Sequence, residues 1–492
     1  MTHSCLPPIT LDSMCHADAI ACVVRLMERV GALEEITTQQ QQKIVQQQQE
    51  IAQLQARLCK DSHNSSKPPS SDGLQRRTKS LRTQSGAKVG GQVGHPGSTL
   101  KKSVRVDHII THPLPAHCDV CGHTLAGVVG VEETETRQVI DLPAIRFEVT
   151  EHRIVRAQCR CGAHQCSSFP TDVISSVQYG ASIRAAAVYL TQYQQLPFQR
   201  CAQALRDLFG VRISAASVVN YVQQAAEALR GAVAHIAQAL LAQPVVHFDE
   251  TGLRHGKTLV WMHSASTGEL TWYGAHPKRG QEAMTAGNIL PRFTGVAVHD
   301  GWQAYRHYDC LHALCNAHHL RELVFIFEST GQSWARQMMH VLCAAKEQMQ
   351  VIREANGRPD AAWVQDIGEQ YHALLRRGVI DNPVQLRPLD HPTRQGRVKQ
   401  SAATNLLRRL YEYDQDVLRF TTDPNVPFDN NQAERDIRMP KLKQKVSGCF
   451  RTLHGIDAFC TIRSYLSTLH KAQKNLLHAL TETFQGRVPV AV

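Results

Sequence analysis

Long apolar segments are missing from this sequence. No run of about twenty apolar residues occurs, the length that spans the hydrocarbon core of a bilayer, so we expect no membrane span and no membrane partner. The N-terminus lacks a basic segment followed by an apolar core, so we expect no secretion signal. Acidic residues are fewer than basic ones, 43 against 54, and the formal charge of +11 favours a polyanionic partner.

An even, closely spaced set of cysteines is also missing. The 15 cysteines are an odd number scattered through 492 residues, which disfavours a disulfide framework and favours metal ligands or free thiols in a reducing, cytoplasmic compartment. A chain of this length suggests about three domains. Its apolar fraction of 42% and charged fraction of 20% are ordinary for a soluble globular protein.

A heptad pattern over residues 17–59 predicts an N-terminal coiled coil, because its seam is buried only against another helix. The two seam positions hold Val23, Leu26, Val30, Leu33, Thr37, Gln40, Ile44, Gln47, Ile51, Leu54 and Leu58. We therefore expect the chain to form a homo-oligomer through this helix. A helix that folds back on its own domain is the alternative.

Residues 60–103 are rich in helix breakers and small polar residues, which predicts a flexible linker. Three of its basic residues, Arg76, Arg77 and Lys79, are candidates for contacts with a phosphate backbone. A linker that is only solvated is the alternative.

Two cysteine motifs lie within residues 104–170: Cys118-Asp-Val-Cys121-Gly and, about forty residues later, Cys159-Arg-Cys161-Gly. Each places two thiols at a tight turn before a glycine, which is typical of a tetrahedral structural zinc site. Strand-like residues between them, such as 146–157, fit a zinc-ribbon-like unit. The single residue between Cys159 and Cys161 leaves His164 or Cys166 open as an alternative ligand. Ordinary reduced cysteines are the other interpretation.

The region 178–240 is predicted to be helical. One amphipathic helix covers residues 197–209 and ends at a glycine, and Ser214 is the expected N-cap of the next helix. This arrangement resembles a helix-turn-helix, in which Ser214, Ser217 and Asn220 would lie near a DNA groove. A helical hairpin that only supports the following domain is the alternative.

Three acids stand at places where a ligand can reach them. Asp249 ends a short apolar strand, Asp300 ends another, and Glu434 lies in a helical segment within residues 428–436. Three carboxylates from three segments can hold two magnesium ions, since hard cations prefer carboxylate oxygens. Any single strand-end aspartate is more commonly a turn former or a helix cap.

Three acids share the last of these segments. Asp429 precedes the helical run and is predicted to be its N-cap. Glu434 lies in the next turn, with a side chain long enough to reach the metals. Asp436 is about 200° further around the helix and is expected to face elsewhere. The basic residues after Glu434 suit phosphate held beside a metal, and they are Arg435, Arg438, Lys441 and Lys443.

Between the first two acids, two further strands and a helix are predicted, at 258–264, 269–274 and 280–290. After Asp300, residues 311–321 contain Cys315, His318 and His319, which suggest a second metal site. A fifth strand running into a helix, with the histidines lining a cleft, is the favoured interpretation.

Four short motifs occur in order along the chain. They are Asp-Glu-Thr at 249–251, His-Asp-Gly at 299–301, Cys-Asn-Ala-His-His at 315–319 and Asp-Asn-Asn-Gln-Ala-Glu-Arg at 429–435. Together they resemble the transposase of the insertion sequence 66 family. The likeness spans roughly residues 20–485 and includes the heptad segment, the cysteine pairs, Asp-Ser-His-Asn-Ser-Ser-Lys-Pro-Pro-Ser-Ser-Asp at 61–72 and Leu-Pro-Phe-Gln-Arg at 196–200.

The resemblance implies an α/β fold with a ribonuclease H-like catalytic core and a DDE triad that transfers onto Asp249, Asp300 and Glu434. The implied boundaries are a core at 244–452, a helical insertion at about 328–422 and a C-terminal helical region at 453–485. DNA, as transposon ends and target, is the implied partner, with accessory proteins of the same element as further candidates. The implied location is the bacterial cytoplasm, at the nucleoid when active.

The expected function is therefore metal-dependent cleavage and strand transfer of DNA by an insertion-sequence transposase. Two rivals remain: a ribonuclease H-like nuclease without strand transfer, and a catalytically inactive DNA-binding regulator. The presence of all three carboxylates disfavours the second.

Overall fold

The computed structural model describes residues 15–58, 60–65, 100–127, 135–143, 145–386 and 398–491. They belong to two compact units. The helical unit contains residues 15–58 and 60–65, Val298–Gly301, and residues 312–386 and 398–430. The sheet unit contains the described residues from 100 to 297, Trp302–Leu311, and residues 431–491. The predicted α/β class is confirmed.

A five-stranded sheet runs in the order β5-β4-β3-β6-β7. The strands are β3 (Val245–His255), β4 (Thr258–Ser266), β5 (Thr271–His276), β6 (Val296–His299) and β7 (Leu311–Leu314). β3 pairs antiparallel with β4, and β4 antiparallel with β5. All five strands were predicted from the sequence. The helix predicted at 280–290 is shorter, since α5 (Gln281–Ala286) is followed by a separate 3-10 turn, η4 (Leu290–Arg292).

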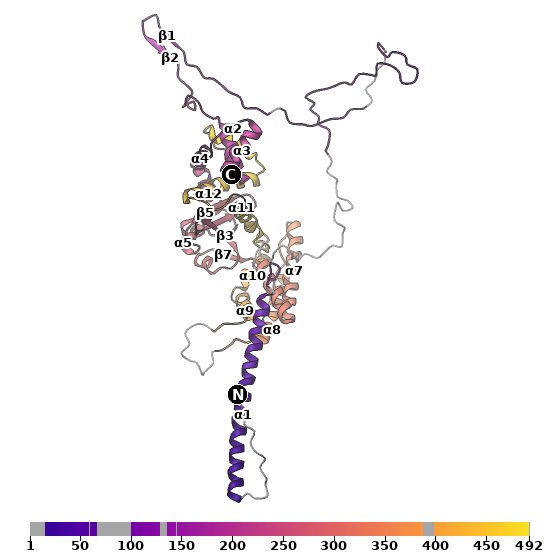
Figure 1. Ribbon diagram of the computed structural model, residues 1–492, viewed down its shortest axis with the longest axis vertical. Coiled ribbons are helices and arrows are strands. Elements are labelled where there is room, and N and C mark those ends of the chain that lie inside the picture. The colour runs from indigo at the N-terminus through magenta and orange to yellow at the C-terminus, as the bar shows by residue number, and fades with distance from the viewer. Residues whose placement is uncertain are drawn as a thin grey trace. The chain divides into compact units, whose positions relative to one another are not determined.

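Side chains alternate between the two faces of this sheet. On one face, Leu253 and Met262 are fully buried and pack with Ile437 of α11 (Asn431–Ser447). On the other face, Phe248 packs with Ile236 of α4 (Ala215–Leu241). Burial of each large apolar side chain stabilises the fold by roughly 1.5–3 kcal/mol relative to exposure. Helices therefore cover both faces, as the group of α4, α5, α11 and α12 around the strands in Figure 1 illustrates.

Helices precede the sheet as predicted: α2 (Ala181–Val188), the π-helical turn η3 (Tyr189–Tyr193), α3 (Phe198–Phe209) and α4. α3 ends at Gly210, which adopts a left-handed φ of 71° that glycine tolerates best. The Ser214 side chain accepts a hydrogen bond from the Ser217 N–H and caps α4. Both predicted helix boundaries are confirmed.

The C-terminal helical region expected at 453–485 consists of two helices. α12 (Leu453–Lys471) is capped by the Thr452 side chain, and α13 (Leu476–Phe484) is capped by that of Asn475. The chain turns between them because Asn475 satisfies the first N–H groups of a new helix.

The helical unit contains the predicted helical segment between the second and third acids. Its helices after the sheet are α6 (Asn316–Thr330), α7 (Ser333–Glu354), α8 (Ala361–Asp381), α9 (Ala402–Glu412) and α10 (Asp414–Thr422). Tyr371 of α8 is fully buried, and its hydroxyl donates to the Leu410 carbonyl of α9 at 2.8 Å. A Cβ at Gly378 would lie 2.6 Å from the Leu407 side chain, so glycine permits the close approach of α8 and α9.

The N-terminal helix α1 (His16–Leu58) is continuous over 43 residues and is drawn in indigo in Figure 1. Its apolar seam is exposed within the described residues: Val30 is 51% and Leu33 60% exposed. Residues 60–65, predicted to begin a flexible linker, instead pack on α6. Asn64 is 5% exposed, and its side-chain amide donates to Glu328 at 3.0 Å.

A short hairpin and an isolated antiparallel bridge between His117 and Thr124 form in the described part of the predicted zinc-ribbon region. β1 (Arg156–Gln158) pairs antiparallel with β2 (His164–Cys166). The strand predicted at 146–157 is therefore wrong except at its last two residues. Among the described residues, no helix has both the length and the apolar character that crossing a membrane requires.

Candidate functional site

Asp249 lies in the middle of β3, on the sheet face covered by α11. It shares that face with Leu253, four residues on, which packs against Ile437 of α11. Its Oδ1 accepts a hydrogen bond from the Glu250 N–H at 2.8 Å. Ser264 stands opposite on β4, and its hydroxyl donates to the Asp249 carbonyl oxygen at 3.2 Å. Asp249 is thus held by a rigid strand next to the helix that carries Glu434.

Glu250 points to the other face and serves a different purpose. Its side chain is 1% exposed, and its Oε1 accepts two hydrogen bonds from Arg279, at 3.0 and 2.7 Å. The Tyr305 hydroxyl donates to Oε2 at 2.6 Å. Arg279 stacks between Trp261 and Trp302, whose ring centroids lie 4.8 and 4.0 Å from its guanidinium. Local sequence patterns did not predict this network, because its members come from separate segments.

Asp300 follows directly after β6, which neighbours β3 in the sheet. A histidine pair of the helical unit lies beside it. The Nδ1 of His299 accepts a hydrogen bond from the Gly301 N–H at 3.0 Å, so its Nε2 carries the proton and donates to Nδ1 of His312, also at 3.0 Å. His299 is fully buried. The first bond therefore fixes the backbone after Asp300, and the second holds the side chain of the residue before it.

Glu434 lies in the first turn of α11, one turn earlier than predicted, because the helix begins at Asn431. The helix begins at Asn431, so Asn430 and not Asp429 occupies the position before it, and the predicted N-cap was wrong by one residue. Asn430 is 1% exposed, and its N–H donates to Sγ of Cys315 at 3.1 Å. The sequence misplaced the cap because two asparagines that cap equally well follow Asp429.

Asp436 forms an ion pair, with its Oδ2 2.9 Å from Nζ of Lys471 at the end of α12. Both side chains are 12% exposed. Asp436 thus pairs with Lys471, on a side of the helix about 200° away from Glu434.

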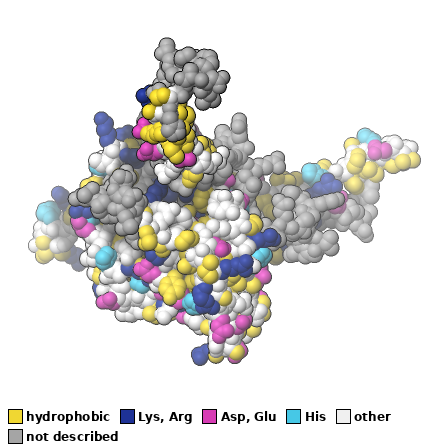
Figure 2. Space-filling view, turned by 90° about the horizontal axis from the view of Figure 1, so that it is seen from below, with side chains coloured by type: hydrophobic (Ala, Val, Ile, Leu, Met, Phe, Trp, Pro, Cys, Tyr) yellow, Lys and Arg dark blue, Asp and Glu magenta, His cyan; other side chains and the backbone are white. Residues whose placement is uncertain are grey.

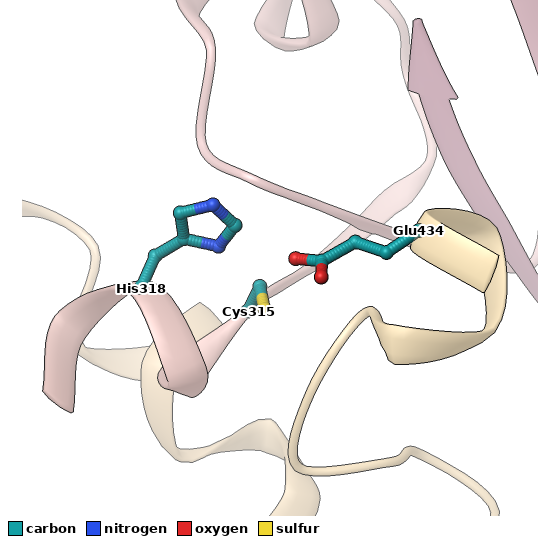
Figure 3. A group of neighbouring side chains, drawn as sticks. All are labelled: Cys315, His318 and Glu434. Atoms are coloured by element: carbon teal, nitrogen blue, oxygen red, sulfur yellow. The ribbon is translucent and has the colours of Figure 1, made fainter. Parts of the chain in front are cut away.

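Cys315 and the histidines after it begin α6, the helix predicted to follow the fifth strand. His319 is 4% exposed and its Nδ1 lies 3.0 Å from Oδ1 of Asn316, so it does not line a cleft as predicted. Burial lowers the pKa of His319 to about 3. Figure 3 draws Cys315 and His318 at the start of α6 and Glu434 at the start of α11. We assign Cys315 and His318 no function.

The basic residues of α11 differ in exposure. Arg435, Arg438 and Lys441 are exposed. Lys443 is instead packed with its ammonium 3.8 Å from the centroid of the Phe450 ring, and burial lowers its pKa to about 8. On the face drawn in Figure 2, Lys and Arg side chains lie among acidic and apolar ones and do not form a single block. The exposed Arg435, Arg438 and Lys441 make a local basic surface on α11.

The candidate helix-turn-helix residues lie at the N-terminus of α4. Ser214 is exposed, but its hydroxyl is engaged as the cap and lies 3.0 Å from that of Ser217. Asn220 is exposed on the next turn. Arg76, Arg77 and Lys79 lie outside the described residues.

The two cysteine pairs form similar turns. The Gly122 N–H donates to the Cys118 carbonyl oxygen at 2.9 Å, and the Gly162 N–H to that of Cys159 at 2.8 Å. Hydrogen bonds from Cys121 and Val120 lower the pKa of the Cys118 thiol, and those from Cys161 lower the pKa of Cys159. A lowered thiol pKa favours the thiolate that binds zinc. Each turn therefore fits half of a zinc site, although within the described residues the four thiols do not form one ligand set.

Three families match parts of this chain. The one described as Transposase IS66 family matches residues 176–458, more than half of the chain, including Asp249, Asp300 and Glu434. The zinc-finger binding domain of transposase IS66 matches residues 115–162. A family of unknown function matches residues 16–101. No curated protein matches the chain.

The boundary of the zinc-finger match bears on the choice of ligands. It ends at residue 162, so it includes Cys118, Cys121, Cys159 and Cys161 and leaves out His164 and Cys166. In the hairpin, Cys166 pairs with Arg156, at the end of the strands away from the turn that carries Cys159. Both observations favour Cys161 as the fourth ligand of a structural zinc.

Proposed function

Since the chain belongs to the IS66 family of transposases, we propose that it cleaves and joins DNA at a metal site formed by Asp249, Asp300 and Glu434. The observation that carries the proposal is the position of two of these acids within the sheet unit. Asp249 lies on the sheet face that packs against α11, and Glu434 lies in the first turn of that helix.

The strand order further supports a ribonuclease H-like core. Three consecutive antiparallel strands are followed by two that join at the other edge of β3, which gives the order β5-β4-β3-β6-β7. Asp249 on the central strand and Asp300 after the adjacent β6 are the acids that such a core would present. Separate rigid segments then hold the carboxylates.

Each residue has a distinct part in the proposed reaction. The three carboxylates would hold two magnesium ions, which when bound activate a water or a 3′-hydroxyl and stabilise the leaving oxygen. Arg438 and Lys441 follow Glu434 by four and seven residues, so they share its side of the helix and would hold the DNA phosphates there. Ser264 and the His299–His312 pair keep the backbone beside the first two acids in place.

The proposed assembly includes parts outside the core. The cysteine turns would bind a structural zinc, the N-terminus of α4 would contact the transposon end, and α1 would pair two chains through its exposed seam. Accessory proteins of the same element would be further partners.

The deciding experiment incubates the protein with the DNA that flanks its own gene and with magnesium, and maps the nicks. Asp249→Ala and Asp300→Ala should abolish cleavage while DNA binding survives, because basic surfaces elsewhere provide the affinity. Equal loss of binding and cleavage in a folded variant would contradict this division. Joining of pre-cut ends to target DNA distinguishes a transposase from a nuclease without strand transfer. Cleavage that never appears with the unaltered chain would favour the inactive regulator.

A further inference from the structure

Helix α11 contains a proline in its interior. Pro440 is buried and lies six residues after Glu434. Proline has no N–H, so in a regular helix it leaves the carbonyl oxygen four residues earlier without its donor. In α11 that oxygen belongs to Asp436. A buried carbonyl without a donor is destabilising, so another group must satisfy it.

Tyr273 supplies the missing donor from the neighbouring sheet. Its hydroxyl donates to the Asp436 carbonyl oxygen at 2.9 Å. Tyr273 lies on β5, is 3% exposed, and packs among the apolar residues between the sheet and α11. The bond therefore joins the sheet to the backbone of α11 at the turn that follows Glu434.

A second anchor fixes the same turn. Nζ of Lys471 donates to Oδ2 of Asp436 at 2.9 Å and to the carbonyl oxygens of Thr267 and Leu270 at 2.8 and 3.0 Å. Its three donors are thus all used. Gln432 adds a hydrogen bond to Oδ2 of Asp436 at 3.1 Å. The contacts with the Asp436 carbonyl and with its side chain therefore hold α11 at a single turn.

We propose that Tyr273 is a positioning residue: by satisfying the carbonyl that Pro440 leaves without a donor, it fixes the rotation of α11 and thereby the direction of Glu434. This rests on the proposed role of Glu434 as a metal ligand. A carboxylate two residues from the anchored carbonyl moves with the backbone of that turn. Loss of the bond therefore weakens metal binding before it affects contact with DNA.

The test measures the magnesium concentration that gives half-maximal cleavage. Tyr273→Phe should raise it by about fivefold, the effect of one lost hydrogen bond, with DNA affinity unchanged. Tyr465→Phe is the matched control, because its buried hydroxyl also donates to a backbone carbonyl, that of Pro489, at 2.9 Å. Both variants should lose thermal stability, but Tyr465→Phe should keep the original magnesium requirement.

A second variant tests the role of the proline. Pro440→Ala restores an N–H for the Asp436 carbonyl, so adding Tyr273→Phe to it should leave the magnesium requirement unchanged. If Tyr273→Phe behaves like Tyr465→Phe, or if its effect persists beside Pro440→Ala, the proposal is overturned. Should Tyr273→Phe fail to fold, folding of the double variant supports the proposal and its failure to fold refutes it.

The same assay separates this inference from the proposed function. If Glu434→Gln remains active, Glu434 is not a metal ligand, and the proposed function fails. Glu434→Gln that is inactive, together with a normal magnesium requirement in Tyr273→Phe, refutes the inference alone.

Discussion

At the scale of the residue, two adjacent acids on one strand serve opposite purposes. Asp249 lies on the face toward α11, whereas Glu250 is buried on the other face between Arg279 and Tyr305. The sequence Asp-Glu-Thr presents both as candidates, and only the alternation of side chains across the sheet separates them. Helix geometry separates Glu434 and Asp436 in a similar way, because side chains two residues apart on a helix point in directions about 200° apart.

The acids of α11 give a direct comparison. Glu434→Gln should abolish magnesium-dependent cleavage with the fold intact, because the neutral amide binds magnesium more weakly than a carboxylate does. Asp436→Asn should keep most activity, since its remaining oxygen still accepts from Lys471, but should lower stability by about 1–3 kcal/mol as the charge partner is lost. Cleavage assays and urea unfolding measure the two effects. Asp429→Asn is expected to be mild. An active Glu434→Gln beside an inactive Asp436→Asn would reassign the third ligand.

A buried histidine predicts sensitivity to acid. Burial lowers the pKa of His263 to about 4, and the side chain is 9% exposed. Because the folded pKa lies below the unfolded value of about 6.5, the unfolded chain binds the proton more tightly, and stability falls as pH drops below 6.5. The loss should reach about 2 kcal/mol at pH 5.

Urea unfolding at pH 7.5 and pH 5 measures this loss. His263→Gln does not titrate, so its stability should fall by about 2 kcal/mol less than that of the unaltered chain over the same interval. An identical pH dependence in the two proteins would show that His263 does not contribute.

At the scale of the element, the short cysteine turns are the clearest case of local sequence specifying local structure. Cys118–Gly122 and Cys159–Gly162 each form a tight turn around glycines with positive φ, of 73° and 89°. Such turns need only a few residues, so the cysteine spacing alone predicted them. The strand predicted before the second turn did not form, because a strand depends on a partner that local sequence does not supply.

Freshly prepared reduced protein should carry about one zinc per chain, the stoichiometry of a four-cysteine site. Cys118→Ser should lose the metal and destabilise the small region, since metal binding and folding are coupled there. Cys166→Ser is the control and should keep the zinc, because this residue lies away from the turn. Metal analysis decides, and zinc lost from the control but kept in Cys118→Ser would reverse the ligand assignment.

At the scale of the whole molecule, the exposed seam of α1 bears on assembly. A continuous helix of 43 residues carries an apolar seam that is exposed within the described part of the chain. Burying each Leu or Val of the seam against a second helix would contribute roughly 1.5–3 kcal/mol. Self-association would also hold two transposon ends in one complex, as the proposed reaction requires.

Residues 1–60 should therefore self-associate at micromolar concentration in sedimentation experiments. Leu33→Glu, on the seam, should weaken the association of the fragment and of the full chain. Gln42→Glu changes charge on the opposite side of the helix and should have little effect. A fragment and a full chain that both stay monomeric at high micromolar concentration would exclude this role for α1.

Much of the fold was predictable because its signals are local. Apolar runs gave all five strands of the sheet, and Gly210 and Ser214 gave the boundary between α3 and α4. Heptad spacing gave α1, and the order of short motifs gave the family that the matched residues confirm. These features depend on side-chain periodicity and backbone preference, which the sequence contains directly.

The remaining features depend on contacts between distant segments. Tertiary structure decided that Glu250 pairs with Arg279, that Lys443 packs over Phe450, and that residues 60–65 lie on α6. It also brought the Tyr273 hydroxyl to the Asp436 carbonyl, which Pro440 leaves without a helical donor. Tyr273 and Asp436 are 163 residues apart in the chain. No local pattern encodes such pairs, because burial of a polar group becomes favourable only when folding brings its partner within hydrogen-bonding distance.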